Sequence, residues 1–180
     1  MKPTTITTRR TVANDEAEPP QVDLQVTCDA PGLPEERDVG HWIALAAAGS
    51  GREIPAGAEI SVRIVDEVES QSINRQYRGK DRPTNVLAFP AELETLPGLP
   101  SVEHTALGDL VICAPIVSRE AVAQGKTEAA HWAHLVVHGF LHLVGFDHES
   151  DAEAAEMEGL EVAILASMGL GNPYEDRHLT

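Results

Sequence analysis

The chain has 180 residues, of which 42% are hydrophobic and 4% are aromatic, and its formal net charge is −16. The length allows one domain with a core that must be mostly aliphatic. The charge argues against a nucleic-acid binder, because a negative field repels polyphosphate, so an RNA or DNA function requires a local patch of positive charge. No apolar run reaches the roughly 18 residues that span a bilayer, which argues against a membrane protein.

The start of the chain shows no cationic segment followed by an apolar stretch, so we see no secretory signal. Cys28 and Cys113 each lie in a strand-like apolar run. We expect two buried thiols rather than a disulfide, which is typical of a cytoplasmic protein. The chain is therefore predicted to be cytoplasmic, with no membrane partner.

Residues 1–20 lack periodicity and end in Pro-Pro, so we expect a disordered tail, followed by a single domain over 21–170 and a C-terminal tail over 171–180. Apolar patterns predict strands at 22–28, 58–67, 85–90 and 107–115. Helices are predicted at 35–49, 116–125, 127–145 and 150–169, with a short helix running into a loop across 67–84. The prolines of 90–105 indicate a surface loop. This order predicts an α+β fold, a small mixed β-sheet packed with helices.

The stretch "HLVVHGFLHLVGFDHES" contains four of the eight histidines. His138 and His142 are four apart on a predicted helix, so they share one face. Gly145 can adopt a left-handed conformation, which would turn the chain and return His148 to the same ion. The pattern H-x-x-x-H-x-x-G-x-x-H supplies three ligands and leaves one position open, as in a catalytic zinc site. We expect the metal-binding helix to line a cleft.

The other histidines carry weaker signals. His134 lies one turn before His138 and is expected to support the ligands or the core rather than to bind the ion. His41, His104, His131 and His178 are interpreted as incidental. The sequence does not decide which group moves the proton in the reaction. Asp147 and Glu149 flank His148, but they also suit a supporting or helix-start role.

The histidine spacing is metzincin-like, so a metalloprotease is one alternative. In metzincins a glutamate follows the first histidine and acts as the general base. Here that position is Gly139, which counts against peptide hydrolysis by that route. Three neutral imidazoles leave the charge of a zinc ion uncompensated, which suits an anionic substrate such as a phosphodiester.

Four cationic residues fall within eight positions with only Asp81 between them: Arg75, Arg78, Lys80 and Arg82. One interpretation is a solvated helix end. The other is a phosphate clamp, because the planar guanidinium fork of arginine binds phosphate oxygens bidentately. Tyr77, in the same stretch, suits either stacking on a base or packing.

The last predicted helix begins with a capping box formed by Ser150 and Glu153. It carries much of the negative charge, which we expect on faces away from the site. Its acidic residues are Asp151, Glu153, Glu156, Glu158 and Glu161.

The blocks "VHGFLHLVGFDH", "SINRQYRGKDRPTNVLAFP" and "LGDLVI" resemble the YbeY family of bacterial rRNA maturation factors, over roughly residues 58–168. The resemblance implies a zinc-dependent, single-strand-specific endoribonuclease acting in 16S rRNA 3′-end processing, small-subunit maturation and ribosome quality control. One departure is visible, since Ala88 stands where the family more usually has serine. A non-catalytic, zinc-containing ribosome assembly factor is the second alternative.

The resemblance also implies site residues and partners. It places one Zn²⁺ per chain on His138, His142 and His148, and an essential arginine at Arg78. The partners it implies are single-stranded RNA or an rRNA precursor, and the small ribosomal subunit with its assembly factors, with no DNA expected. We expect Arg75, Lys80 and Arg82 to hold the RNA strand and Arg78 to stabilise the charge of the transition state.

Overall fold

The computed structural model describes residues 18–91 and 105–175. The predicted N-terminal tail, apart from its last three residues, and most of the predicted loop at 90–105 lie outside the described residues. None of the helices within the described ranges is long and apolar enough to cross a membrane.

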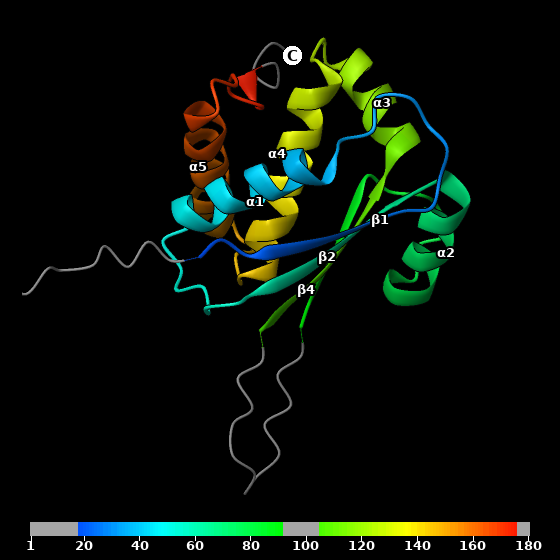
Figure 1. The fold of residues 1–180 in the computed structure, drawn as a ribbon. Helices are drawn as coiled ribbons and strands as arrows, with labels where there is room; N and C mark the ends of the chain where they lie inside the picture. Colours follow the sequence, from blue (N-terminus) through cyan, green and yellow to red (C-terminus); the bar gives the residue numbers. More distant parts are fainter. Residues whose placement is uncertain (1–17, 92–104, 176–180) are drawn as a thin grey trace, which may run out of the picture.

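The described chain forms four strands and five helices, and the predicted α+β fold is confirmed (Figure 1). The elements are β1 (Gln21–Val26), α1 (Glu36–Gly49), β2 (Glu59–Val65), α2 (Glu67–Arg78), β3 (Val86–Pro90), β4 (Ala106–Cys113), α3 (Ala114–Ala123), α4 (Glu128–Leu143) and α5 (Asp151–Ser167). Several boundaries differ from the prediction by one or two residues; for example, α3 begins at Ala114, directly after β4. Pro115 stands in its first turn, where the missing N–H costs no helical hydrogen bond.

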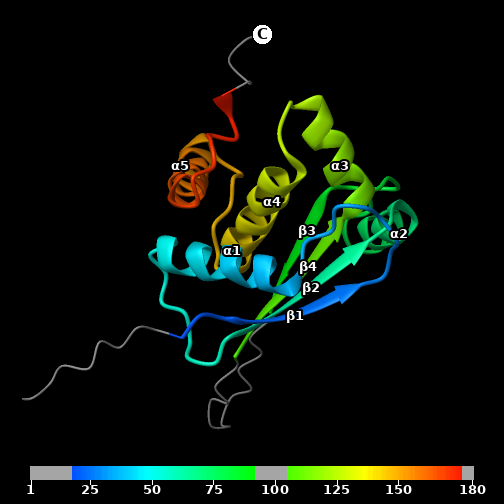
Figure 2. The same cartoon turned by 45° about the horizontal axis from the view of Figure 1, so that its top comes forward.

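The four strands form one mixed sheet in the order β1-β2-β4-β3. β1 and β4 run parallel to β2, whereas β3 is antiparallel to β4 and forms an edge of the sheet. Helices α1 and α4 lie on one face and α2 on the other, with α5 packed outside α4 (Figure 2). The open edge at β3 therefore lies beside α4.

Strand alternation decides which side chains enter the main core. Ile60, Val62 and Ile64 of β2 are each no more than 1% exposed and pack beneath α1 and α4. Each such side chain contributes roughly 1.5–3 kcal/mol by leaving water. Odd positions of β4, such as Val111, point to the opposite face and form a smaller cluster beside α2. The larger core thus anchors α4, the helix that carries the histidines.

Both cysteines are free thiols, as expected. Cys113 is buried at the end of β4, whereas Cys28 lies just past β1 and is half-buried, so the prediction of burial was right for Cys113 only. Burial raises the pKa of both thiols, which keeps them protonated and unreactive.

Candidate metal centre

Helix α4 begins at the predicted cap, where the Thr127 hydroxyl accepts from the Ala130 N–H. Gly139 is on the buried side of this helix. A Cβ at Gly139 would lie 2.8 Å from a Leu110 methyl and 3.4 Å from Val86. Metzincins have their glutamate at this position, whereas here Gly139 brings helix α4 into close contact with the sheet. A glutamate side chain has no room there, which removes that route to a general base.

We expect Gly139→Ala to lower the free energy of unfolding by about 1–3 kcal/mol, because the added methyl group overpacks the helix–sheet contact. Denaturant unfolding of the apo protein measures this. Gly159→Ala in α5 is the matched control, since a Cβ there meets nothing within 4 Å. That change should stabilise the protein by about 0.5–1 kcal/mol through helix propensity. Equal effects of the two changes would contradict the close contact.

The turn after α4 brings the third histidine back, as its sequence predicts. Gly145 has a φ of +92°, in the left-handed region that favours glycine. The Phe146 N–H donates to the Leu141 carbonyl at 3.0 Å, and the Phe146 ring is buried beneath the guanidinium of Arg52 at 4.3 Å. A packed aromatic ring therefore anchors the reversed chain.

The three predicted ligands come together. One ring nitrogen from each of His138, His142 and His148 lies within 4.8 Å of the other two. The ring centroids of His138 and His142 are 4.7 Å apart, and that of His148 lies 4.9 Å from His142. The His148 side chain is 57% exposed. The cluster is therefore open to solvent on the side of His148, as a catalytic rather than a structural site requires.

Hydrogen bonds select the tautomers of the two helical histidines. The His138 Nδ1–H donates to the Glu161 carboxylate at 2.7 Å, and the His142 Nδ1–H donates to the Phe146 carbonyl at 2.9 Å. Both acceptors lack hydrogens, so each ring carries its proton on Nδ1 and directs an Nε2 lone pair into the site. Burial, and the neighbouring His138 and His148, lower the pKa of His142, which favours its neutral form.

The donor set fits a zinc ion. The Nε2 atoms of His138 and His142 are 3.2 Å apart. Two lone pairs facing each other at this distance repel unless a cation lies between them. Zn–N bonds of about 2.0–2.1 Å at a tetrahedral angle place two nitrogens about 3.3 Å apart. The spacing and the tautomers of these rings therefore suit Zn²⁺.

Glu161 is a residue of the candidate site that the sequence analysis does not predict. It was assigned to the charged outer face of the last helix, but it is 0% exposed, so that assignment was wrong. Burial alone raises the pKa of Glu161, yet hydrogen bonds from His134 and His138, together with Tyr174, lower it to about 2. A permanent negative charge thus lies directly behind the candidate ligand His138.

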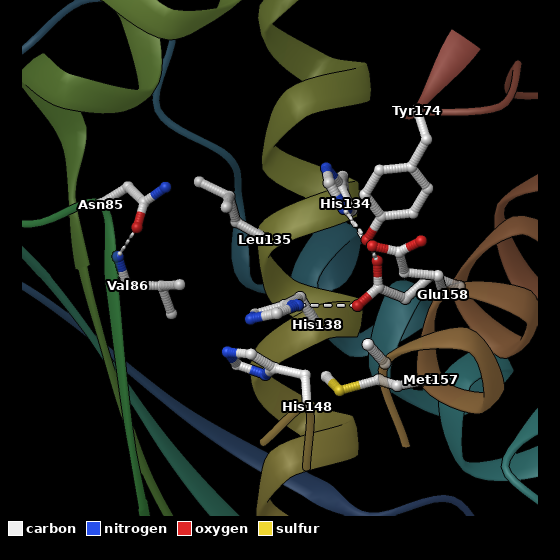
Figure 3. A pocket seen from close by; sticks show the side chains of 11 residues that line it. Asn85, Val86, His134, Leu135, His138, His148, Met157, Glu158 and Tyr174 are labelled. Atoms are coloured by element: carbon white, nitrogen blue, oxygen red, sulfur yellow. Dashed lines mark hydrogen bonds and ion pairs between the residues drawn. The ribbon is translucent and has the colours of Figure 1, made fainter. Parts of the chain in front are cut away.

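Two more side chains complete the network behind the ligands (Figure 3). The His134 Nε2–H donates to Glu161 at 3.0 Å, and the Tyr174 hydroxyl donates to the same carboxylate oxygen. His134 is therefore linked to the candidate ligand His138 through Glu161, and its expected supporting role stays a prediction. Tyr174 follows residue 170, at which the predicted domain ends, yet it packs edge-on against His134 with ring centroids 5.5 Å apart.

A pocket of about 290 Å³ lies in front of the histidines. His134, His138 and His148 line one side, while Asn85 and Val86 of the β3 segment lie opposite (Figure 3). The Asn85 Oδ1 accepts from the Val86 N–H at 2.7 Å, so this wall is locally braced. Helix α4 therefore lines a cleft, as predicted.

His131 is structural rather than incidental. Its side chain is 3% exposed, and its Nε2 lies 2.8 Å from the Glu120 carboxylate. Asn85 donates to the same carboxylate at 3.1 Å. The hydrogen bond from His131 is the main reason that the pKa of Glu120 lies below its ordinary value. This group ties α3 and α4 to the start of β3, one wall of the pocket.

The four predicted cationic residues do not line this pocket. All four are exposed, at the end of α2 and in the loop after it, and within the described ranges none of their side chains makes a hydrogen bond or ion pair: Arg75, Arg78, Lys80 and Arg82. The loop itself is held firmly, because the buried Ser70 exchanges hydrogen bonds with the Thr84 backbone and the buried Asn74 donates to the Arg82 carbonyl. It leads directly into Asn85 at the pocket wall.

Tyr77 lies beside this basic loop and is 63% exposed. Its ring packs edge-on against Phe89 with centroids 5.1 Å apart. It thus packs on one side and leaves much of its surface to solvent.

Comparison with known proteins identifies the family. The model of the family described as "Endoribonuclease YbeY" matches residues 35–169. A protein of that name from Halorhodospira halophila is 54% identical over 80% of this chain and 90% of its own length. The protein of that name from Xanthomonas axonopodis pv. citri is 52% identical over 89% of this chain and 98% of its own.

The fold has a counterpart among solved structures. The solution structure of TM1509 from Thermotoga maritima aligns with a TM-score of 0.51 and 25% identity, covering 87% of this chain and 98% of that one. The family match spans the histidine helix, the basic loop and all but the first strand of the sheet. This chain therefore belongs to the YbeY endoribonuclease family.

Proposed function

We propose that this chain is a zinc-dependent, single-strand-specific endoribonuclease of the cytoplasm. Its proposed roles are 16S rRNA 3′-end processing, small-subunit maturation and ribosome quality control, with an rRNA precursor, the small subunit and its assembly factors as partners. The observation that carries the proposal is the cluster of three imidazole nitrogens within 4.8 Å, open at His148, in a chain of this family.

His138, His142 and His148 are the proposed ligands of one zinc ion. When bound, zinc supplies Lewis acidity for attack on a phosphodiester. The chain positions the ligands through two fixed acceptors, the Glu161 carboxylate behind His138 and the Phe146 carbonyl behind His142. Pocket walls from β3 and α5 then limit how the RNA strand approaches the histidines.

Arg78 and its cationic neighbours are the proposed phosphate-binding residues. Their exposed side chains have no acidic partner within the described residues, so their charge is available to an RNA backbone despite the net charge of −16. Since none of them lines the pocket, we propose that all four hold phosphates of the strand that leads to the histidines. For Arg78 we also propose the role that the family resemblance implies, stabilising charge in the transition state. The reacting phosphate would lie at the histidines themselves.

Arg78→Ala should keep its zinc and bind single-stranded RNA about 10- to 100-fold more weakly, the loss expected for a charge-assisted contact to phosphate. The plot of log affinity against log salt concentration should become less steep, its negative slope decreasing in magnitude by about 0.7. Fluorescence anisotropy over a salt series, with metal analysis of each sample, measures both. Arg37→Ala, which removes an exposed arginine from α1, is the matched control and should leave both unchanged. Unchanged affinity and salt slope for Arg78→Ala would contradict the assignment.

Two assays separate the alternatives. A metalloprotease would degrade casein, whereas we expect the zinc-loaded protein to cleave single-stranded RNA and leave casein intact. A non-catalytic assembly factor would still rescue ribosome assembly in depleted cells when it carries Arg78→Ala. We expect that variant to fail, and rescue together with loss of cleavage in vitro would favour the non-catalytic role.

A further inference from the structure

The outer edge of β3 presents peptide groups beside the pocket. At one end of the strand, the Cys113 N–H donates to the Asn85 carbonyl at 2.9 Å; at the other, the Ala91 N–H donates to the Leu107 carbonyl at 3.0 Å. Hydrogen-bonded residues alternate along an antiparallel pair. With the observed register, the peptide groups of Val86, Ala88 and Pro90 therefore point away from β4, toward the free edge.

Most of these outward groups are acceptors. The Val86 N–H is already bonded to the Asn85 Oδ1, and Pro90 has no N–H. Within the described residues, the edge thus offers a single free donor, the Ala88 N–H, between the carbonyls of Val86 and Ala88. Pro90 agrees with an unpaired edge, because proline within a sheet is confined to such positions.

This edge continues the wall of the pocket. Val86 faces His138 and His148 across it (Figure 3). Ala88 lies two residues farther, about 7 Å along the strand. A nucleotide with its phosphate at the histidines can therefore reach the Ala88 peptide with its base.

We propose that the outer edge of β3 binds the Watson–Crick face of the base next to the scissile phosphate, with the Ala88 N–H donating to that base and the carbonyl of Val86 or Ala88 accepting from it. This inference rests on the proposed function. A phosphate would be repelled by the flanking carbonyls, whereas a donor beside an acceptor matches the Watson–Crick face of every base. That face is free only in an unpaired strand, so the contact selects single strands without selecting a sequence.

The first test needs no variant of the protein. Zinc-loaded wild-type protein is given a short single-stranded RNA that carries one 1-methyladenosine or 3-methyluridine, moved along the sequence one position at a time. The methyl group blocks the Watson–Crick face. When the methyl group is at one particular position relative to the cleavage site, the affinity of the protein for the RNA should fall by at least about threefold, which is the loss expected for one hydrogen bond. Equal affinity and cleavage at all positions would overturn the inference. No cleavage of unmodified RNA would overturn the proposed function itself, and the inference with it.

The second test removes the donor. Ala88→Pro deletes the N–H at an outward position of the same kind as Pro90, and Ala88→Ser keeps it as the matched control. We expect Ala88→Pro to retain zinc and thermal stability and to bind unmodified RNA about 3- to 10-fold more weakly. With RNA methylated at the sensitive position, Ala88→Pro should bind as tightly as the wild-type protein does, with no further loss of affinity. Fully additive losses would refute a shared contact, and if the proline variant fails to fold, the methylation scan decides alone.

Discussion

His138→Ala should lose zinc binding and RNA cleavage together. The substitution removes one of three proposed ligands, and with it the ring whose Nδ1–H donates a hydrogen bond to Glu161. Because losing a residue that merely supports a ligand already costs about 10- to 100-fold in metal affinity, we expect a loss above about 100-fold here. Competition against a chelating dye measures affinity, and cleavage of a single-stranded rRNA precursor measures activity.

His41→Ala is the matched control for this change. His41 is an exposed histidine on α1, outside the cluster, so both zinc affinity and cleavage should stay at the wild-type level. Thermal unfolding of the metal-free proteins separates lost binding from lost folding. A folded His138→Ala protein that still bound zinc with wild-type affinity would rule out His138 as a ligand, and with it the proposed site.

Glu161→Gln is expected to weaken zinc binding by about 10- to 100-fold while the three ligands remain. The carboxylate accepts from His138, His134 and Tyr174, and its pKa of about 2 keeps it ionised at any pH where histidines are neutral. The neutral amide offers one acceptor oxygen and adds N–H groups that face donors. His138 would then lose its preferred tautomer in part of the molecules, and cleavage at limiting zinc should fall in parallel.

Glu156→Gln serves as the control, because it removes the same charge from an exposed position of the same helix. It should not change zinc affinity. Excess zinc should restore much of the activity of Glu161→Gln if the role is to position His138. Wild-type zinc affinity of the folded Glu161→Gln protein would show that this network is structural only.

Local patterns predicted the elements well because their causes are local. The cap at Thr127, the capping box of Ser150 and Glu153, and the left-handed Gly145 all occur as expected. Two histidines one helical turn apart share a face in any helix, so the spacing of His138 and His142 already implied a shared ligand site.

The role of Glu161 was hidden because charged side chains usually face solvent. One signal was present, since Glu161 lies one turn after Met157 and one turn before Leu165, both on the apolar face of α5. An acidic residue on such a face must find partners when it is buried. The sequence did not say which partners, because His134 and His138 are on a different helix.

The sequence by itself determined the fold class, the histidine helix, its turn and the three candidate ligands, because periodicity and backbone preference act over a few residues. Only the tertiary structure decided that Glu161 and Tyr174 lie behind the ligands, that Asn85 and Val86 face them, and that Arg78 lies outside the pocket. Apart from Arg78, these residues lie 13 to 63 positions from the histidines in the sequence, and such contacts are settled by how helices and strands pack rather than by any local pattern.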